Sequence, residues 1–331
     1  MQDRYGGPQV LRLEDVPVPR PAADELLVRV HAASVNAHDW HVMRGDPLLA
    51  RAAAPDMFGR TGPRNRVRGR DIAGVVESVG HEVTSFRPGD EVYGDLGNAD
   101  GAFAEYACVP LTGVAAKPAR LNFEQAAAIP LAGTTALMAL RDAAALSAGQ
   151  HLLINGASGG VGTFAIQVAR ALGTQVTAVC STRNVDLARS LGAHHVVDYT
   201  GRDFTRSGGR YDVVLDLVGN HSLTALRRSV RTNGTIVLSG GGVSRGGSVV
   251  GPMGLMIRAK AVAPFLRPKV VVLPTRPSAA HLQVLGGMVE SGELSPILDR
   301  TYDLPEAAYA IRHLETEHAR GKVVIRVTTQ G

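Results

Sequence analysis

A glycine-rich turn between a short apolar run and an apolar-periodic stretch is the part of this sequence best suited to bind an anion. Residues 151–155 predict a strand, and residues 163–172 repeat apolar side chains at helical spacing. Between them stands Gly-Ala-Ser-Gly-Gly-Val-Gly, residues 156–162. Glycines let backbone N–H groups approach a pyrophosphate, and the start of the following helix carries a partial positive charge. The segment therefore predicts a dinucleotide site.

The context supports this interpretation, because glycine spacing alone also arises by chance in surface turns. Residues 175–180 are rich in β-branched side chains and end about twenty residues after the turn, where the ribose of a dinucleotide is recognised. Ser181, Thr182 and Arg183 follow. A carboxylate there selects NAD, whereas hydroxyls and a guanidinium suit a 2′-phosphate. The sequence predicts NADPH as cofactor, with capping of a solvated helix as the alternative role of Arg183.

Length and composition indicate a two-domain globular protein. The chain has 331 residues, 45% of them hydrophobic and 20% charged. No apolar stretch approaches the roughly twenty residues of a membrane span, and residues 1–10 lack the form of a signal peptide, so a cytoplasmic location without membrane contact is expected. Cys108 and Cys180 each lie in a predicted buried strand, which favours reduced core thiols.

The net charge of +5 gives little reason to expect a nucleic-acid partner. The arginines are spread along the chain, and no aromatic residues are interleaved with them to stack bases. The densest group comprises five arginines, at positions 60, 64, 66, 68 and 70. We expect a solvated, flexible loop there; the alternative is a basic rim that steers the cofactor's phosphates.

The elements that must position these residues fall into two patterns. The first third of the chain predicts an all-β, barrel-like domain, because it contains short β-branched or aromatic runs at 26–30, 72–79, 91–93 and 103–109. Helices over 123–128 and 134–145 follow. Strands then begin near residues 151, 175, 195, 213, 235 and 269 and alternate with helices, which predicts a doubly wound six-stranded parallel sheet. The tail, with helices over 278–291 and 305–316 and a strand over 322–327, returns to the first domain.

Seven segments share a family's motifs in order and spacing. They are ASVNAHDW (33–40), GRDIAGVV (69–76), PGDEVYG (88–94), GAFAEY (101–106), IPLAGTTA (129–136), the glycine turn and ARGKVVI (319–325). Together they resemble the zinc-independent quinone oxidoreductase branch of the medium-chain dehydrogenase/reductase superfamily. The resemblance implies a GroES-like β-barrel domain (residues 1–120), a Rossmann domain (121–268), a C-terminal return (269–331) and a cofactor cleft between the domains. It also implies NADPH-dependent hydride transfer to a quinone, enone or similar activated carbonyl compound, and a homodimer paired near residues 269–273.

Zinc-using members of the superfamily place a cysteine near Asn36 and a His-Glu pair where Arg70 and Asp71 stand. Since this chain offers no thiolate there, we expect no catalytic metal. The alternative metal site would use four closely spaced residues, His31, His38, Asp39 and His41.

Without a metal, hydrogen-bond donors must stabilise the oxygen that gains negative charge. The resemblance places residues 36–41 in the cleft, so Asn36 and Trp40 are the expected donors, with Tyr93 opposite them. A final proton would come from His41, Tyr93 or water. The structural alternatives are that Asn36 bridges backbone groups, that Trp40 only packs and that Tyr93 lies in a core strand.

The resemblance also implies the cofactor contacts, which we list by the part of NADPH they face. At the diphosphate we expect Ala157, Ser158, Gly159, Gly160, Val161 and Gly162, and at the 2′-phosphate Ser181, Thr182 and Arg183. Tyr199 should face the adenosine, while Thr134 (at a helix start), Ser239 and Gly240 should face the nicotinamide half. Lys322 should contact a phosphate, and its alternative role is a surface salt bridge.

Two other functions were weighed against this one. A short-chain reductase needs a tyrosine followed four residues later by a lysine, and no tyrosine here has one. A non-catalytic NADPH-binding protein would keep the same glycine turn, so the sequence leaves it open. The sequence also does not name the substrate.

Overall fold

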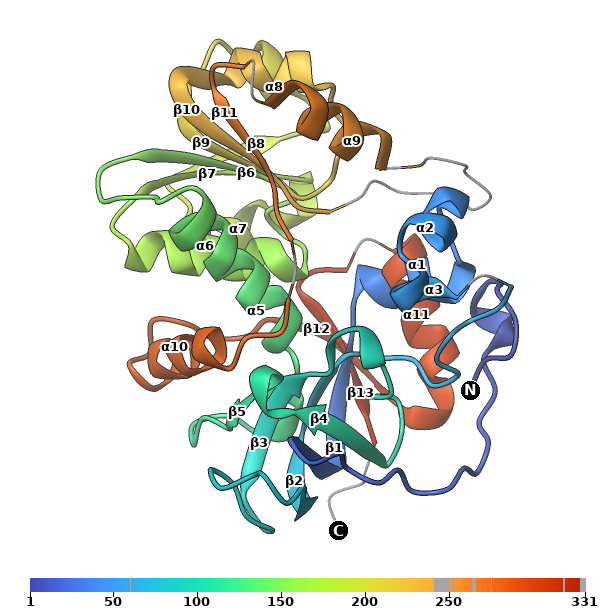
Figure 1. Cartoon of the computed structure of the whole chain (residues 1–331). Helices are drawn as coiled ribbons and strands as arrows, with labels where there is room; N and C mark the ends of the chain where they lie inside the picture. The colour runs from blue at the N-terminus through green and yellow to red at the C-terminus, as the bar shows by residue number, and fades with distance from the viewer. Residues whose placement is uncertain are drawn as a thin grey trace. The chain divides into compact units, whose positions relative to one another are not determined.

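The computed structural model describes residues 1–59, 61–240, 251, 253–263, 266–274, 276–317 and 319–327. The chain forms two compact units, residues 1–134 with 276–331 and residues 135–275, drawn in Figure 1. The predicted boundaries at 120 and 268 lie earlier. They differ because α4 (Phe123–Ala127) packs on the first unit's strands, and because β11 (Lys269–Val272) is a strand of the second unit's sheet.

The second unit is a doubly wound parallel sheet, as predicted. Its six strands are β6 (His151–Asn155), β7 (Gln175–Cys180), β8 (His195–Asp198), β9 (Tyr211–Asp216), β10 (Val230–Leu238) and β11, in the order β11-β10-β9-β6-β7-β8. Figure 1 shows α6 (Gly160–Ala171) and α7 (Val185–Ser190) on one face and α8 (Leu223–Ser229) and α9 (Met253–Val262) on the other. Strand order reverses between β6 and β9, and ligands of such sheets bind beyond the carboxyl ends at that point.

The central strands of this sheet are apolar because helices cover both faces. Leu152, Leu153 and Ile154 of β6 are fully buried, as are Val214 and Leu215 of β9. Their burial fixes the strand ends, and with them the turn that follows β6.

The first unit contains a seven-stranded sheet built from both ends of the chain. Its strands are β1 (Glu25–Val35), β2 (Asp71–Val79), β3 (Glu91–Asp95), β4 (Tyr106–Pro110), β5 (Val114–Ala116), β12 (Leu298–Asp303) and β13 (Lys322–Arg326), in the order β12-β13-β1-β2-β3-β5, with β4 also paired to β1. The predicted return of the tail is confirmed, since β13 runs antiparallel to β1.

The first third of the chain is not all-β, which corrects our prediction. Three helices follow β1: α1 (Ala37–Arg44), α2 (Leu48–Ala53) and α3 (Pro55–Phe58). Asn36 caps α1, and its backbone N–H donates to the Asp39 carboxylate at 2.7 Å. Gly45 ends the helix with φ +61°. The cap residues at its start and the glycine at its end were visible in the sequence, but the helix is too short to show a clear apolar period.

The remaining helices lie close to their predicted places, with one shift that affects the site. α5 (Pro130–Leu137) begins at a proline, which suits the first turn, and continues as a π-helical stretch over 138–143. Thr134 is therefore inside a helix and buried, not at a helix start. α10 (Ala279–Glu290) and α11 (Ala307–Thr316) belong to the first unit.

Both cysteines are free and lie in strands, Cys108 in β4 and Cys180 in β7, as predicted. Cys180 is buried and Cys108 is half-buried. In the described part of the chain, we find no helix that combines the length and the apolar character needed to cross a bilayer.

Candidate coenzyme and active sites

The turn after β6 is closely packed at Gly156, Ala157 and Gly162. Gly156 has φ +88°, a conformation that glycine adopts without strain. A Cβ on Gly162 would lie 2.3 Å from the Gly156 carbonyl oxygen, so only glycine lets α6 start so close to the strand. Ala157 is fully buried beneath the turn. These contacts hold the backbone amides of the turn at the first turn of α6.

Gly159 differs, because the protein itself does not require a glycine there. Among the described residues other than its two chain neighbours, the nearest atom to a Cβ there would be the Gly156 carbonyl oxygen, at 3.6 Å. Residues 158–161 are half-exposed. The space beside Gly159 is thus open to a ligand that must approach the backbone closely.

A buried asparagine that the sequence analysis missed joins the turn to the end of β7. The Asn184 amide donates to Ser158 Oγ at 2.9 Å and to Ser181 Oγ at 3.2 Å. Thr182 and Arg183 beside it are exposed. Asn184 precedes α7, where an asparagine caps well, and this position was the available signal.

A carboxylate also lies at the predicted 2′-phosphate end, and it too was missed. Thr182 Oγ1 donates to Asp198 Oδ2 at 2.5 Å, and the other carboxylate oxygen accepts from the backbone and hydroxyl of Thr200. The hydrogen bond from Thr182, followed by those from Thr200, lowers the pKa of Asp198. Tyr199, predicted at the adenosine side, follows β8 and is 56% exposed. The residue directly before Arg183 is therefore bonded to a carboxylate.

The carboxyl ends of β9 and β10 carry further polar groups. Ser239 follows β10 and donates its N–H to the Asp216 carbonyl at 2.9 Å. Gly240 has φ +118°, and a Cβ there would lie 2.5 Å from the Leu217 carbonyl oxygen. The buried Asn155 amide donates to the Asp216 carboxylate at 2.9 Å, which joins the ends of β6 and β9.

Within the first unit, a second site gathers four buried polar side chains. The Lys322 ammonium donates to Asn36 Oδ1 at 2.5 Å and to Asp71 Oδ2 at 3.3 Å. The Asn36 amide and the Ser34 hydroxyl each donate to the same Asp71 oxygen at 2.9 Å. We call Ser34, Asn36, Asp71 and Lys322 the lysine cluster. The alternative role considered for Lys322, a surface salt bridge, is wrong, because its ammonium forms a buried ion pair with Asp71.

Within the lysine cluster, the Asp71 carboxylate is paired with a positive charge and hydrogen-bonded at both oxygens. Asp71 Oδ1 accepts the backbone N–H of Leu131 at 3.0 Å, so both of its oxygens are bonded. Burial raises the pKa of Asp71, while the positive charge of Lys322 opposes that rise. The Asn36 amide also donates to the Ser34 carbonyl at 3.4 Å. Asn36 is thus fixed by bonds to its neighbours. This arrangement resembles the alternative considered for it, in which Asn36 bridges backbone groups.

Two further buried ion pairs correct our interpretation of the arginine group. Arg70 makes two bonds to Asp95, at 2.9 and 2.8 Å, and Arg68 Nη1 lies 3.0 Å from Asp100. Both arginines are almost fully buried, so this part of the group is neither a solvated loop nor a basic rim. Carboxylates distant in sequence, at the end of β3 and beyond it, make this burial possible. Arg60 lies outside the described residues.

Asp39 is a buried carboxyl that forms no ion pair with any of the described residues. One oxygen accepts the Asn36 N–H, and the other, among the described residues, has no hydrogen-bond partner. Burial, followed by repulsion from Asp100, raises the pKa of Asp39 to about 8, with Lys322 opposing and Asp71 adding to the rise. The group is therefore protonated at neutral pH in the folded protein.

This burial predicts a pH-dependent stability that the Asp39→Asn variant removes. The folded protein keeps a proton that the unfolded chain, with a carboxyl pKa of 3.8, loses. The unfolding free energy of the wild type therefore falls as pH rises from about 4 to about 8, by on the order of 3–5 kcal/mol. Urea unfolding across this range should show the fall in the wild type and a flatter profile in Asp39→Asn. The exposed Asp24→Asn substitution is the control, and parallel profiles for all three proteins would contradict the assignment.

Tyr93, predicted to lie opposite Asn36 and Trp40, is bonded within the protein in this structure. Its ring is fully buried, and its hydroxyl donates to the Leu282 carbonyl of α10 at 2.5 Å. Burial also raises the pKa of Tyr93 far above its ordinary range. The hydroxyl thus joins β3 to α10, an arrangement close to the core-strand alternative considered for this residue.

The residues weighed as an alternative metal site are not brought together. His31 stacks on Phe123, with ring centroids 4.3 Å apart, and His38 Nε2 lies 3.5 Å from Asp100. His41 stacks on Trp40 at 3.7 Å and its Nδ1 lies 3.1 Å from the Asp46 carbonyl oxygen. Burial lowers the pKa of all three histidines. Trp40 is mostly buried, and within the described residues no group of three or more His, Cys, Asp or Glu side chains is arranged to hold a metal.

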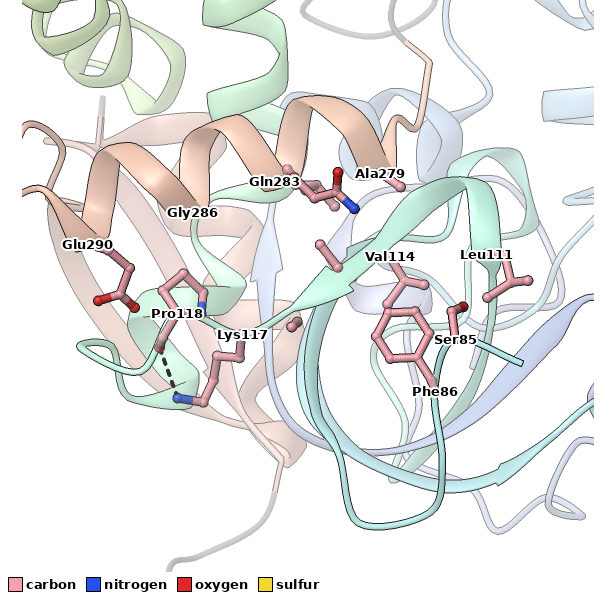
Figure 2. Close-up of a pocket in the computed structure, with 13 residues that line it drawn as sticks. Ser85, Phe86, Leu111, Val114, Lys117, Pro118, Ala279, Gln283, Gly286 and Glu290 are labelled. Atoms are coloured by element: carbon pink, nitrogen blue, oxygen red, sulfur yellow. Dashed lines mark hydrogen bonds between the residues drawn. The ribbon is translucent and has the colours of Figure 1, made fainter. Parts of the chain in front are cut away.

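The first unit also contains a cavity of about 570 Å³ between β5 and α10, shown in Figure 2. Two of its polar side chains, those of Lys117 and Glu290, are already engaged. Lys117 Nζ donates to the Leu121 carbonyl at 2.6 Å, and Glu290 accepts the Ala119 N–H at 2.6 Å. No member of the lysine cluster lines this cavity. It therefore is not the candidate active site.

Comparison with known proteins places the chain in one family along its whole length. Residues 22–119 match the alcohol dehydrogenase GroES-like domain, and residues 191–325 match the zinc-binding dehydrogenase domain. A quinone oxidoreductase of Sus scrofa is 33% identical over 96% of this chain and 93% of its own length. An NADPH-dependent alkenal/one oxidoreductase of Arabidopsis thaliana is 33% identical over 97% of this chain and 77% of its own length. The structure of a quinone oxidoreductase from Coxiella burnetii superposes with a TM-score of 0.84 at 31% identity, covering 99% of this chain and 98% of that one. The chain is therefore an oxidoreductase and belongs to the quinone oxidoreductase-like branch of the medium-chain dehydrogenase/reductase superfamily.

Proposed function

We propose that this chain transfers a hydride from NADPH to a quinone, an enone or a similarly activated carbonyl compound without a catalytic zinc ion. The names of the relatives from Sus scrofa and Arabidopsis thaliana support the reaction class. The open backbone beside Gly159 and the polar ends of β7 and β10 support nucleotide binding by the second unit. Bound NADPH supplies the hydride, and the protein supplies binding and a fixed electrostatic environment.

The zinc-free part of the proposal rests on one observation, the ammonium of Lys322 held between Asn36 and Asp71. In the zinc-using members, a cysteine stands near the position of Asn36, and the glutamate of a His-Glu pair stands at the position of Asp71. Here a lysine already neutralises the carboxylate, and an amide replaces the thiolate that zinc prefers. We retain Asn36 as a positioning residue and Trp40 as a proposed donor near the substrate oxygen.

The test is NADPH oxidation with a panel of quinones and enones, in the presence and absence of a strong chelator. We expect turnover with at least one class of acceptor and the same rate after chelation. Loss of activity on chelation, restored by zinc, would overturn the zinc-free assignment. Tight NADPH binding with no turnover across the panel would favour the non-catalytic binding protein instead.

Cofactor selectivity provides a prediction at Arg183. Its guanidinium can form charge-assisted hydrogen bonds to the 2′-phosphate, so NADPH should bind much more tightly than NADH. Arg183→Ala should shrink that difference by about 1–3 kcal/mol. Titration of both nucleotides, followed by fluorescence, measures the ratio of the dissociation constants for NADH and NADPH.

Two variants sharpen this test. Arg189→Ala removes an exposed arginine of α7 that pairs with Asp186, and the ratio should stay unchanged. Asp198→Asn removes the nearby negative charge, so the preference for NADPH should increase. Equal ratios for Arg183→Ala and the wild type would refute the role of Arg183.

The expected homodimer and cytoplasmic location stay predictions. β11 is the edge strand of the second unit's sheet, as pairing of two copies through residues 269–273 would require.

A further inference from the structure

Four arginines of the second unit line a pocket of about 350 Å³ at the amino ends of its strands. They come from three separate segments: Arg210 directly before β9, Arg227 and Arg228 in the last turn of α8, and Arg267 shortly before β11. The wall is completed by Thr224, Val230, Thr232 and Pro268. We call this the arginine pocket.

The arginine pocket is separate from the coenzyme site of the same unit. All six strands run parallel, so their amino ends lie at the edge opposite the glycine turn. β9 starts at Tyr211, next to Arg210, and ends at Asp216, beside Asn155. A strand of this length spans about 17 Å. An anion in the pocket would not occupy the cradle of the NADPH diphosphate.

The arginines of the pocket have no acidic partner within the described chain. All four are exposed, and none forms an ion pair with a described carboxylate. Their one direct link is a hydrogen bond of 3.4 Å from Arg227 Nη2 to the Arg267 carbonyl. By contrast, the neighbouring Arg231, which does not line the pocket, binds Asp212 at 2.5 Å. The chain thus neutralises an adjacent arginine and leaves the pocket positively charged.

Ordinary helix electrostatics explain only half of this arrangement. Cations in the last turn of α8 are favoured by the helix dipole, which accounts for Arg227 and Arg228. Arg210 and Arg267 belong to other segments, and bringing them to the same pocket adds repulsion. An anion that binds all four would remove that repulsion.

The chemistry of the wall identifies the class of anion. Guanidinium groups match phosphate oxygens in pairs, and two threonine hydroxyls add further donors. A phosphate group carries about −1.5 to −2 charges at neutral pH, so two or three linked groups balance four arginines. No aromatic residue lines the pocket to stack a base. We propose that the arginine pocket binds a small oligophosphate, recognised through two or three linked phosphate groups, either inorganic or carried by a nucleotide.

Calorimetric titration with inorganic tripolyphosphate at fixed ionic strength tests this proposal. Arg227→Ala/Arg228→Ala should raise the dissociation constant about tenfold for each arginine removed, about 100-fold together. The control is Arg189→Ala/Arg206→Ala, which removes the same charge from exposed arginines paired with Asp186 and Asp203. It should change the constant less than about twofold, because screening weakens distant surface charges. Thermal unfolding of each variant verifies the fold, and light scattering verifies that its mass is unchanged.

Each outcome decides the question. No saturable binding, or equal weakening in the control pair, would overturn the proposal, since both point to diffuse surface charge. ATP that competes with tripolyphosphate supports it and identifies a nucleotide as an acceptable source of the phosphates, while binding of tripolyphosphate alone supports the inorganic source. A single-stranded oligonucleotide that binds far more tightly and is lost in Arg227→Ala/Arg228→Ala would overturn it in favour of nucleic acid. None of these measurements depends on reductase activity, so the proposed function stands or fails separately.

Discussion

Replacing Lys322 by methionine is expected to lower the unfolding free energy by about 3–5 kcal/mol, because a buried carboxylate loses its counter-charge. The Lys322 side chain is 3% exposed and that of Asp71 is fully buried. Asn36 loses the donor to its amide oxygen in the same step. We further expect kcat/KM for NADPH oxidation to fall about 100-fold, since small displacements of positioned groups have effects of that size. Urea unfolding and steady-state kinetics measure the two effects.

A double-mutant cycle separates the ion pair from simple loss of packing. Asp71→Asn alone should also destabilise, whereas Asp71→Asn combined with Lys322→Met should recover much of the stability. Lys117→Met is the matched control, because this lysine is also mostly buried but pairs with a half-exposed Glu91. Additive effects of the two single substitutions would contradict the proposed coupling.

The second large effect is expected in the glycine turn, where two substitutions should behave differently. Gly162→Ala places a Cβ 2.3 Å from a backbone oxygen, so it should lower both the melting temperature and the NADPH affinity. Gly159→Ala meets no atom of the chain within 3.6 Å, so the fold should tolerate it. We expect Gly159→Ala to weaken NADPH binding about 100-fold with little change in melting temperature, because the added methyl occupies space that the diphosphate needs.

Gly287→Ala is the control for both variants. No atom lies within 4 Å of the added methyl group in α10, so affinity should be unchanged and stability should rise slightly. Unchanged NADPH affinity in Gly159→Ala would place the diphosphate elsewhere and remove the basis of the coenzyme site.

The second unit was predictable because its signals are local and repeated. The central strands β6 and β9 contain short apolar runs, and their burial leaves little ambiguity about where they lie. The glycine turn follows directly from the same pattern. The helices after β1 were missed because α1 has only eight residues, too few for a clear apolar period.

The active site was less predictable because its partners are distant in sequence. The sequence predicts Asn36 as a donor in the site, but its bond to Lys322 joins positions 286 residues apart. The burial of Arg68 and Arg70 depends on Asp100 and Asp95, which a local reading of the arginine group cannot pair with them. The bond made by the Tyr93 hydroxyl could not be predicted for the same reason, since its acceptor lies on α10. Spacing along a chain identifies such residues, and only the tertiary fold identifies their partners.

The discontinuous sheet of the first unit has a consequence for synthesis on the ribosome. β13 pairs with β1 and carries Lys322, so the lysine cluster cannot form until Lys322 has left the ribosomal tunnel. The second unit, whose strands are all encoded between these two ends, is complete earlier and is free to fold first. A nascent chain that stops before β13 would contain every strand of the second unit but would hold Asp71 without its lysine.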